Sequence, residues 1–229
     1  MACNTPILRF FRRGTPDRPY DHSVPIPCGR CAACRKDLVT MWSDRCTFEM
    51  MYQPNRSTFL TLTYDDAHCP KDGSVSVDDW NRFKDRLRKN VGHSIKYYMS
   101  SEYGSQTYRP HYHAMLFGFD WQVKENYDNL FKAWSIRGVP LGYISCDYLN
   151  PARVRYVLKY MEKENNQQFL ADLESRGLAP LFHFMSKGIG RQWFFRPCRG
   201  NKKTRRLLRE RKASPLAEVL SRFTWLRAC

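Results

Sequence analysis

Residues 109–120 have the sequence RPHYHAMLFGFD, which places two histidines at the start of an apolar run. Side chains on one face of a β-strand recur every second residue, so a strand here puts His111 and His113 on the same face. A second strand, over 94–102, ends at Glu102, and a short loop joins the two as a hairpin. Two imidazoles and a carboxylate on adjacent strands predict a metal site. The alternative is an exposed sheet edge with a surface acid.

Hydrophobic periodicity and turn residues predict further elements on both sides of this hairpin. The predicted elements are helix 32–50, strand 57–64, helix 74–92, strand 94–102, strand 111–119, helix 123–135, strand 142–149 and a helix that begins at Pro151 and ends near residue 165. This order is typical of the split β-α-β, ferredoxin-like or RRM-like arrangement. We therefore expect an α+β fold, an antiparallel sheet with helices on one face.

Two tyrosines lie one turn apart in the last of these helices. Tyr156 and Tyr160 are at i and i+4 and share a helix face, with Lys159 beside them. Such a pair usually belongs to a packed core, but the flanking basic residues favour contact with phosphate. A phenol has a pKa of about 10, so it needs an activator to act as a nucleophile at neutral pH. Two tyrosines on one face permit two successive phosphoryl transfers, the first forming a phosphotyrosine link and the second resolving it.

Four elements, in order along the chain, resemble the motifs of HUH endonucleases that initiate rolling-circle replication. They are FLTLTYDD (59–66) as the first motif strand, SSEYG (100–104) with the acidic ligand, HYH (111–113) as the histidine signature and YVLKY (156–160) as the paired-tyrosine motif. Tyr112 is a mild departure, since the family places a bulky apolar residue there. PCGRCAACRKD (27–37), followed by WSDRC (42–46), resembles the N-terminal region of initiators from gokushovirus-like microviruses, which are single-stranded DNA phages. The resemblance covers about residues 25–165.

The resemblance implies an HUH endonuclease fold and a metal-dependent, site-specific DNA endonuclease and strand-transferase. Such proteins nick single-stranded origin DNA through tyrosine, stay linked to the 5′ phosphate, and later rejoin the strands in rolling-circle replication. The resemblance also implies catalytic Mg²⁺ or Mn²⁺ at His111, His113 and Glu102. Ligand chemistry alone would admit Zn²⁺ as well.

The roles of the tyrosine-motif residues are carried over from the same resemblance. Relatives with one tyrosine carry a Tyr-x-x-Lys pattern, which favours Tyr156 as first nucleophile and Tyr160 as second. Lys159 would steady the phosphate or lower the phenol pKa, although a solvated helix face is an equal alternative. A relaxase or transposase of the same superfamily would share this chemistry. A non-catalytic, basic, zinc-containing protein that binds single-stranded DNA is the alternative from another class.

Three cysteines form two overlapping C-x-x-C steps, at Cys28, Cys31 and Cys34. A closed structural zinc site uses four ligands. Candidates for the fourth ligand are Cys46, Cys69 and His68. The alternative is a tight turn with three reduced thiols, entering a helix.

The chain is strongly basic, with 38 Lys and Arg against 22 Asp and Glu and a formal net charge of +16. This excess predicts a polyanionic partner, of which nucleic acid is the commonest. We expect DNA contacts from Arg109, Tyr108, Arg153, Arg155 and Lys163, and Tyr103 could stack on an unpaired base. The basic run 201–212 is a further candidate for phosphate contact, or else a solvated tail.

We divide the sequence into an N-terminal arm and cysteine-containing helical segment (1–52), a nicking domain (53–170) and a basic C-terminal segment (171–229). Residues 1–27, rich in proline and arginine, are expected to be irregular. We expect no membrane partner and a place in the host cytoplasm, because no apolar run suits a bilayer span or a secretory signal. The absence of a phosphate-loop motif predicts no nucleotide cofactor. A host helicase and DNA polymerase are therefore expected partners.

Overall fold

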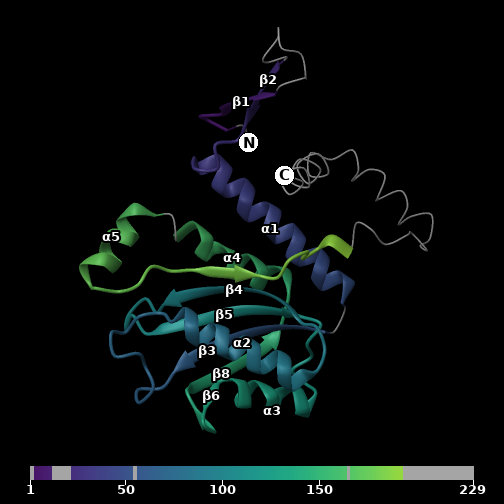
Figure 1. The fold of residues 1–229 in the computed structure, drawn as a ribbon, viewed down its shortest axis with the longest axis vertical. Coiled ribbons are helices and arrows are strands. Elements are labelled where there is room, and N and C mark those ends of the chain that lie inside the picture. Colours follow the sequence, from purple (N-terminus) through teal and green to yellow (C-terminus); the bar gives the residue numbers. More distant parts are fainter. Residues whose placement is uncertain (1–2, 12–21, 54–55, 164–165, 193–229) are drawn as a thin grey trace, which may run out of the picture. The chain divides into compact units, whose positions relative to one another are not determined.

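A computed structural model describes residues 3–11, 22–53, 56–163 and 166–192. The fold is α+β, as predicted, and its centre is a five-stranded antiparallel sheet in the order β8-β3-β5-β4-β9 (Figure 1). The strands are β8 (Gly142–Tyr148), β3 (Ser57–Tyr64), β5 (Pro110–Phe117), β4 (Lys96–Tyr103) and β9 (His183–Met185). The expected hairpin is confirmed, because β4 pairs with β5 and Glu102 lies opposite His111.

One face of the sheet packs against α2 (Val77–Val91) and α3 (Lys124–Ala133). Alternate residues of β3, from Leu60 to Tyr64, point into this core, where Trp80 and Phe83 of α2 meet them. The predicted boundaries of α2 follow from its caps. The Ser76 side chain accepts from a backbone N–H three residues on, and Gly92 ends the helix in the left-handed conformation.

The opposite face carries α4 (Pro151–Lys163), which packs against α1 (Ala32–Tyr52) (Figure 1). The helices therefore lie on both faces, whereas the sequence indicated one. The reason is that β5 is apolar on both sides: Met115 and Phe117 are fully buried and face α4. A strand that is apolar on both faces needs cover on both.

Several short elements differ from the sequence-based expectation. Within the part of residues 1–27 that the structure describes, the chain is not irregular. The strands β1 (Ile7–Phe11) and β2 (His22–Ile26) pair as an antiparallel ladder. The structure also contains α5 (Gln167–Ser175) and the two-residue strands β6 (Ser135–Ile136) and β7 (Val139–Pro140). Strands as short as these, and β9, carry too few residues for a periodic signal.

A buried carboxylate joins α1, β4 and the last described turn. Glu49 of α1 is fully buried, and its carboxylate accepts two hydrogen bonds of 2.9 Å from the Lys96 ammonium of β4. The amide of Gly190 donates to the same carboxylate at 2.8 Å. Residues Met1–Gly190 form one compact unit, to which β9 belongs. The division into three segments stays a prediction, and the run 201–212 lies outside the described residues.

No helix among the described residues is long and apolar enough to cross a membrane.

Candidate functional site

The predicted metal ligands of β4 and β5 lie on the sheet face that α4 covers. His113 Nε2 lies 2.9 Å from Glu102 Oε2, and His113 Nδ1 lies 3.0 Å from the Thr61 hydroxyl of β3. Both ring nitrogens of His113 are therefore held. Glu102 reaches His113 diagonally across the ladder, because its direct opposite is His111.

His111 lies beside this pair with a defined orientation. Its Nδ1 lies 2.6 Å from the carbonyl oxygen of Arg109. A carbonyl only accepts, so Nδ1 carries the proton and Nε2 is the nitrogen with a lone pair. Burial is the main cause that lowers the pKa of His111, which favours the neutral, metal-binding form. The ring centroids of His111 and His113 are 6.4 Å apart.

Both tyrosines of α4 face these sheet residues. The ring of Tyr160 lies parallel to that of His113, with centroids 5.7 Å apart. Tyr156 meets the His113 ring edge-on at 5.3 Å, and meets Tyr160 at the same separation. Phe59 of β3 also stacks on His113, at 5.8 Å. The structure thus brings together the histidine, carboxylate and tyrosine side chains that the sequence singled out.

The two tyrosines have different surroundings. Tyr156 is 45% exposed, whereas Tyr160 is only 3% exposed. Burial, followed by hydrogen bonds to the Glu102 and Tyr156 side chains, raises the pKa of Tyr160 far above its ordinary value. Tyr160 is therefore a protonated phenol that donates to a carboxylate, and Tyr156 is the accessible one.

The donors suit a divalent cation. Two ligands at right angles on an ion with bonds of about 2.1 Å would lie about 3.0 Å apart. The 2.9 Å between His113 Nε2 and Glu102 Oε2 agrees with that separation. The carbonyl bond at His111 Nδ1 is the usual outer-shell device that aims the other nitrogen at a metal. His113, Glu102 and His111 are accordingly the residues that could hold Mg²⁺ or Mn²⁺.

The basic residues of α4 fall into two groups. Lys159 and Arg155 are exposed. Arg153, in contrast, forms an ion pair with Asp147 and lies over the Phe59 ring at 5.8 Å. Lys163 ends the described helix, and its side chain lies outside the described residues.

The predicted DNA contacts of the loop between β4 and β5 are engaged within the protein. Arg109 forms an ion pair with Asp66 and donates to the Tyr64 carbonyl. Tyr108 donates to Asp172 of α5 at 3.0 Å, and the arginine that follows α5 lies over its ring. Tyr103 is buried and donates to a backbone carbonyl, so it does not present its ring for stacking.

The cysteine cluster is present, but with a different fourth member. The Sγ atoms of Cys3, Cys28, Cys31 and Cys34 all lie within 4.8 Å of one another, so this group could bind a metal such as zinc. Cys46, the predicted fourth ligand, is fully buried in the core beneath α4 and is not in the group. The cluster sulfur of Cys28 accepts hydrogen bonds, first from Thr5 and then from backbone amides, which lower its pKa to about 5.

Three contributors were absent from the sequence-based set. Thr61 and Phe59 position His113, and their signal is the alternation in FLTLT, which places them on one strand face. Cys3 lacks any spacing signal, because it lies far from Cys28 in the sequence and is brought close by the β1–β2 ladder.

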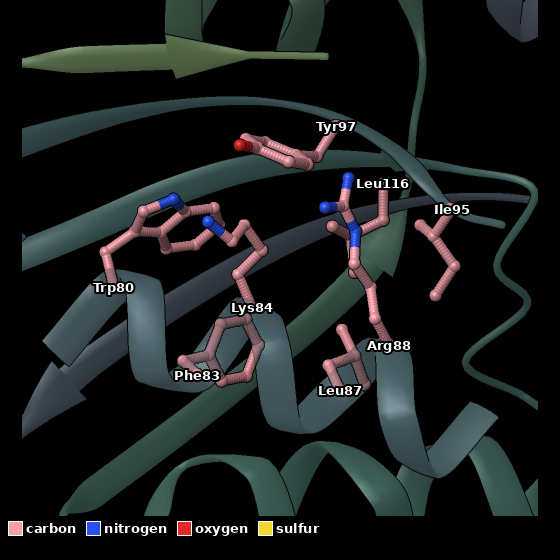
Figure 2. Close-up of a pocket in the computed structure, with 8 residues that line it drawn as sticks. All are labelled: Trp80, Phe83, Lys84, Leu87, Arg88, Ile95, Tyr97 and Leu116. Atoms are coloured by element: carbon pink, nitrogen blue, oxygen red, sulfur yellow. The ribbon is translucent and has the colours of Figure 1, made fainter. Parts of the chain in front are cut away.

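A shallow apolar groove lies on the other face of the sheet. It runs between α2 and β4, and Figure 2 shows Trp80, Phe83 and Leu87 along one wall and Tyr97 along the other. Its lining contains none of the predicted site residues, so it is separate from the site under α4.

Comparison with known proteins places the site in a family. Residues 57–165, which include every histidine, carboxylate and tyrosine of the site, match the family described as replication-associated protein ORF2. The chain is related to phage replication-associated proteins. This confirms the resemblance that the motifs indicated.

Three replication-associated proteins of gokushovirus-like microviruses are similar to the chain. ORF2 of Spiroplasma virus 4 is 29% identical over 193 residues, which are 78% of this chain and 59% of that protein. VP4 of Bdellovibrio phage phiMH2K is 32% identical over 136 residues, 52% of this chain and 42% of that protein. ORF4 of Chlamydia phage 1 is 25% identical over 201 residues, 81% of this chain and 50% of that protein.

The chain thus spans about half the length of the curated relatives it matches. No solved structure matches it.

Proposed function

We propose that this protein is a replication initiator that nicks single-stranded origin DNA through tyrosine, stays linked to the 5′ phosphate and later rejoins the strands. One observation carries the proposal: the paired tyrosines of α4 lie against the His113–Glu102 pair of the sheet. The names of its relatives support a role in phage replication.

The reaction consists of two transfers at phosphorus. In the first, the Tyr156 oxygen attacks the scissile phosphorus, a tyrosine O–P bond forms and the bond to the 3′ oxygen breaks. The phenol loses its proton to a base, and the departing oxygen ends as a 3′ hydroxyl. Mg²⁺ or Mn²⁺ bound at His111, His113 and Glu102 would stabilise negative charge on the phosphate oxygens. In the second transfer, Tyr160 cuts the regenerated origin, and the freed 3′ hydroxyl attacks the Tyr156 phosphodiester to close the circle.

The different surroundings of the two tyrosines set this order. Tyr156 is exposed and can meet a phosphate without rearrangement. Tyr160 is buried and donates to Glu102, so it must first leave that carboxylate. The exposed cations Lys159 and Arg155 would contact the phosphate backbone. A host helicase and DNA polymerase would then act on the nicked origin in the host cytoplasm.

The test uses single-stranded DNA from the protein's own replicon. The DNA is incubated with wild type, Tyr156→Phe, Tyr160→Phe and the double variant, each with Mn²⁺ or with EDTA, and protein–DNA adducts are resolved on a denaturing gel. Tyr148→Phe is the matched control, because Tyr148 is an exposed tyrosine of β8 outside α4.

We expect a metal-dependent adduct with wild type and Tyr148→Phe, a strongly reduced one with Tyr156→Phe, and none with the double variant. Tight DNA binding without an adduct under any metal would overturn the nicking proposal and favour a non-catalytic DNA-binding protein. Adducts formed only on transfer-origin or transposon-end DNA would instead indicate a relaxase or transposase.

A further inference from the structure

Four cysteine sulfurs from three separate segments converge beside the start of α1. Cys3 precedes β1, Cys28 follows β2, and Cys31 and Cys34 lie at the N-cap and in the first turn of α1. Three of the four are partly exposed, so they do not form an ordinary apolar core of thiols. All the described cysteines are free, so these four are not paired as disulfides.

The sulfur separations match a tetrahedral metal site. In a tetrahedron with Zn–S bonds of about 2.3 Å, each pair of sulfurs lies about 3.8 Å apart. The Cys3 and Cys31 sulfurs are 3.8 Å apart, and those of Cys28 and Cys34 are 3.9 Å apart. These two pairs share no atom, so they are opposite edges of the tetrahedron.

Hydrogen-bond donors already surround the sulfurs. The amide of Cys28 donates to Cys3 Sγ at 3.3 Å. The amides of Arg30 and Cys31 donate to Cys28 Sγ at 3.4 and 3.3 Å, and the Thr5 hydroxyl donates to it at 3.3 Å. Donors of this kind stabilise thiolates and form the outer shell of a metal site.

We propose that Cys3, Cys28, Cys31 and Cys34 bind one structural Zn²⁺ through four thiolates, and that this ion fixes the β1–β2 hairpin to the start of α1. Binding forms four Zn–S bonds and releases the thiol protons to solvent, with no change of oxidation state. All four coordination positions are taken by protein, so the ion has no open position for substrate. An isolated two-stranded hairpin is marginally stable, and β1 exposes Ile7, Leu8 and Phe10, so the ion supplies what the hairpin lacks.

The test measures metal content of the full chain. Zinc per chain is measured by mass spectrometry of the purified protein, and Co²⁺ is substituted to record its visible d–d bands. Cys3→Ser removes the ligand that distinguishes this site, and Cys69→Ser is the matched control, because Cys69 is partly buried and packs against the other core.

We expect one zinc per chain in wild type and Cys69→Ser, and a loss of at least tenfold in zinc affinity in Cys3→Ser. The Co²⁺ spectrum of wild type should be that of a tetrahedral tetrathiolate, a measurement that needs no variant to fold. Zinc-free wild type that cannot be loaded, or full affinity in Cys3→Ser, would overturn the proposal. The readout is independent of DNA cleavage, so the nicking proposal can fail without affecting it.

Discussion

His113 is held at both ring nitrogens, by Thr61 at Nδ1 and by Glu102 at Nε2. The Thr61 hydroxyl fixes the ring orientation and the tautomer that a metal at Nε2 would need. The roles of the two imidazoles thus depend on different outer partners, since His111 uses the Arg109 carbonyl for the same purpose.

Thr61→Val should therefore weaken metal-dependent nicking by about 10- to 100-fold, the usual effect of losing an outer-shell partner. The measurement is a Mn²⁺ titration of adduct formation, in which the midpoint should move to higher metal concentration. Thr63→Val is the control, because Thr63 lies on the same strand face but opposite His111. Equal midpoints for all three proteins would show that the hydroxyl does not support the site.

The edge strand β8 extends the site face beyond α4. Thr63 of β3 lies between His111 of β5 and Tyr143 of β8 in the pairing register, so all three residues share a row across the sheet. Tyr143 is 69% exposed. An exposed aromatic ring two strands from the histidines is suited to stacking on an unpaired base next to the scissile phosphate.

Replacing Tyr143 by Ala should weaken binding of single-stranded origin DNA by about 5- to 100-fold, since one stacked base contributes about 1–3 kcal/mol. Tyr143→Phe should bind like wild type, because the ring is kept. Tyr148→Ala is the matched control: Tyr148 is an exposed tyrosine of β8 opposite Thr58, on the other sheet face. Fluorescence anisotropy with labelled DNA gives the affinities, and equal losses at both positions would argue against a specific platform.

The predictable elements are those whose signals are local. The β4–β5 hairpin and α2 follow from alternation and from caps at Ser76 and Gly92. The pairing of β9 with β4 is a long-range contact, so no local pattern announces it. Cys3 was missed for the same reason, since only the fold of the hairpin brings it to Cys28. The placement of α4 opposite α2 follows from β5 being apolar on both faces, a signal that was present but not used.

At the scale of the whole molecule, the net charge of +16 sets how DNA binding depends on salt. Each phosphate neutralised on a single strand contributes a slope of about −0.7 to log K against log salt. Three such contacts predict a loss of about twentyfold in affinity between about 50 and 200 mM salt. Replacing Lys202 and Lys203 by Gln should make the slope shallower by roughly 1. An affinity that does not change with salt would contradict this electrostatic account.

The Glu102–His113 pair spans a single hairpin, whereas the tyrosines arrive from a helix much later in the chain. Contacts between near neighbours in sequence form sooner than contacts that close long loops, because less chain entropy is lost. The donor half of the site should therefore take shape first, and its hydroxyl partners should dock on a preformed surface. Pulsed hydrogen exchange during refolding would show amides of β4 and β5 protected before those of α4. The order of assembly thus lets the nucleophiles join last.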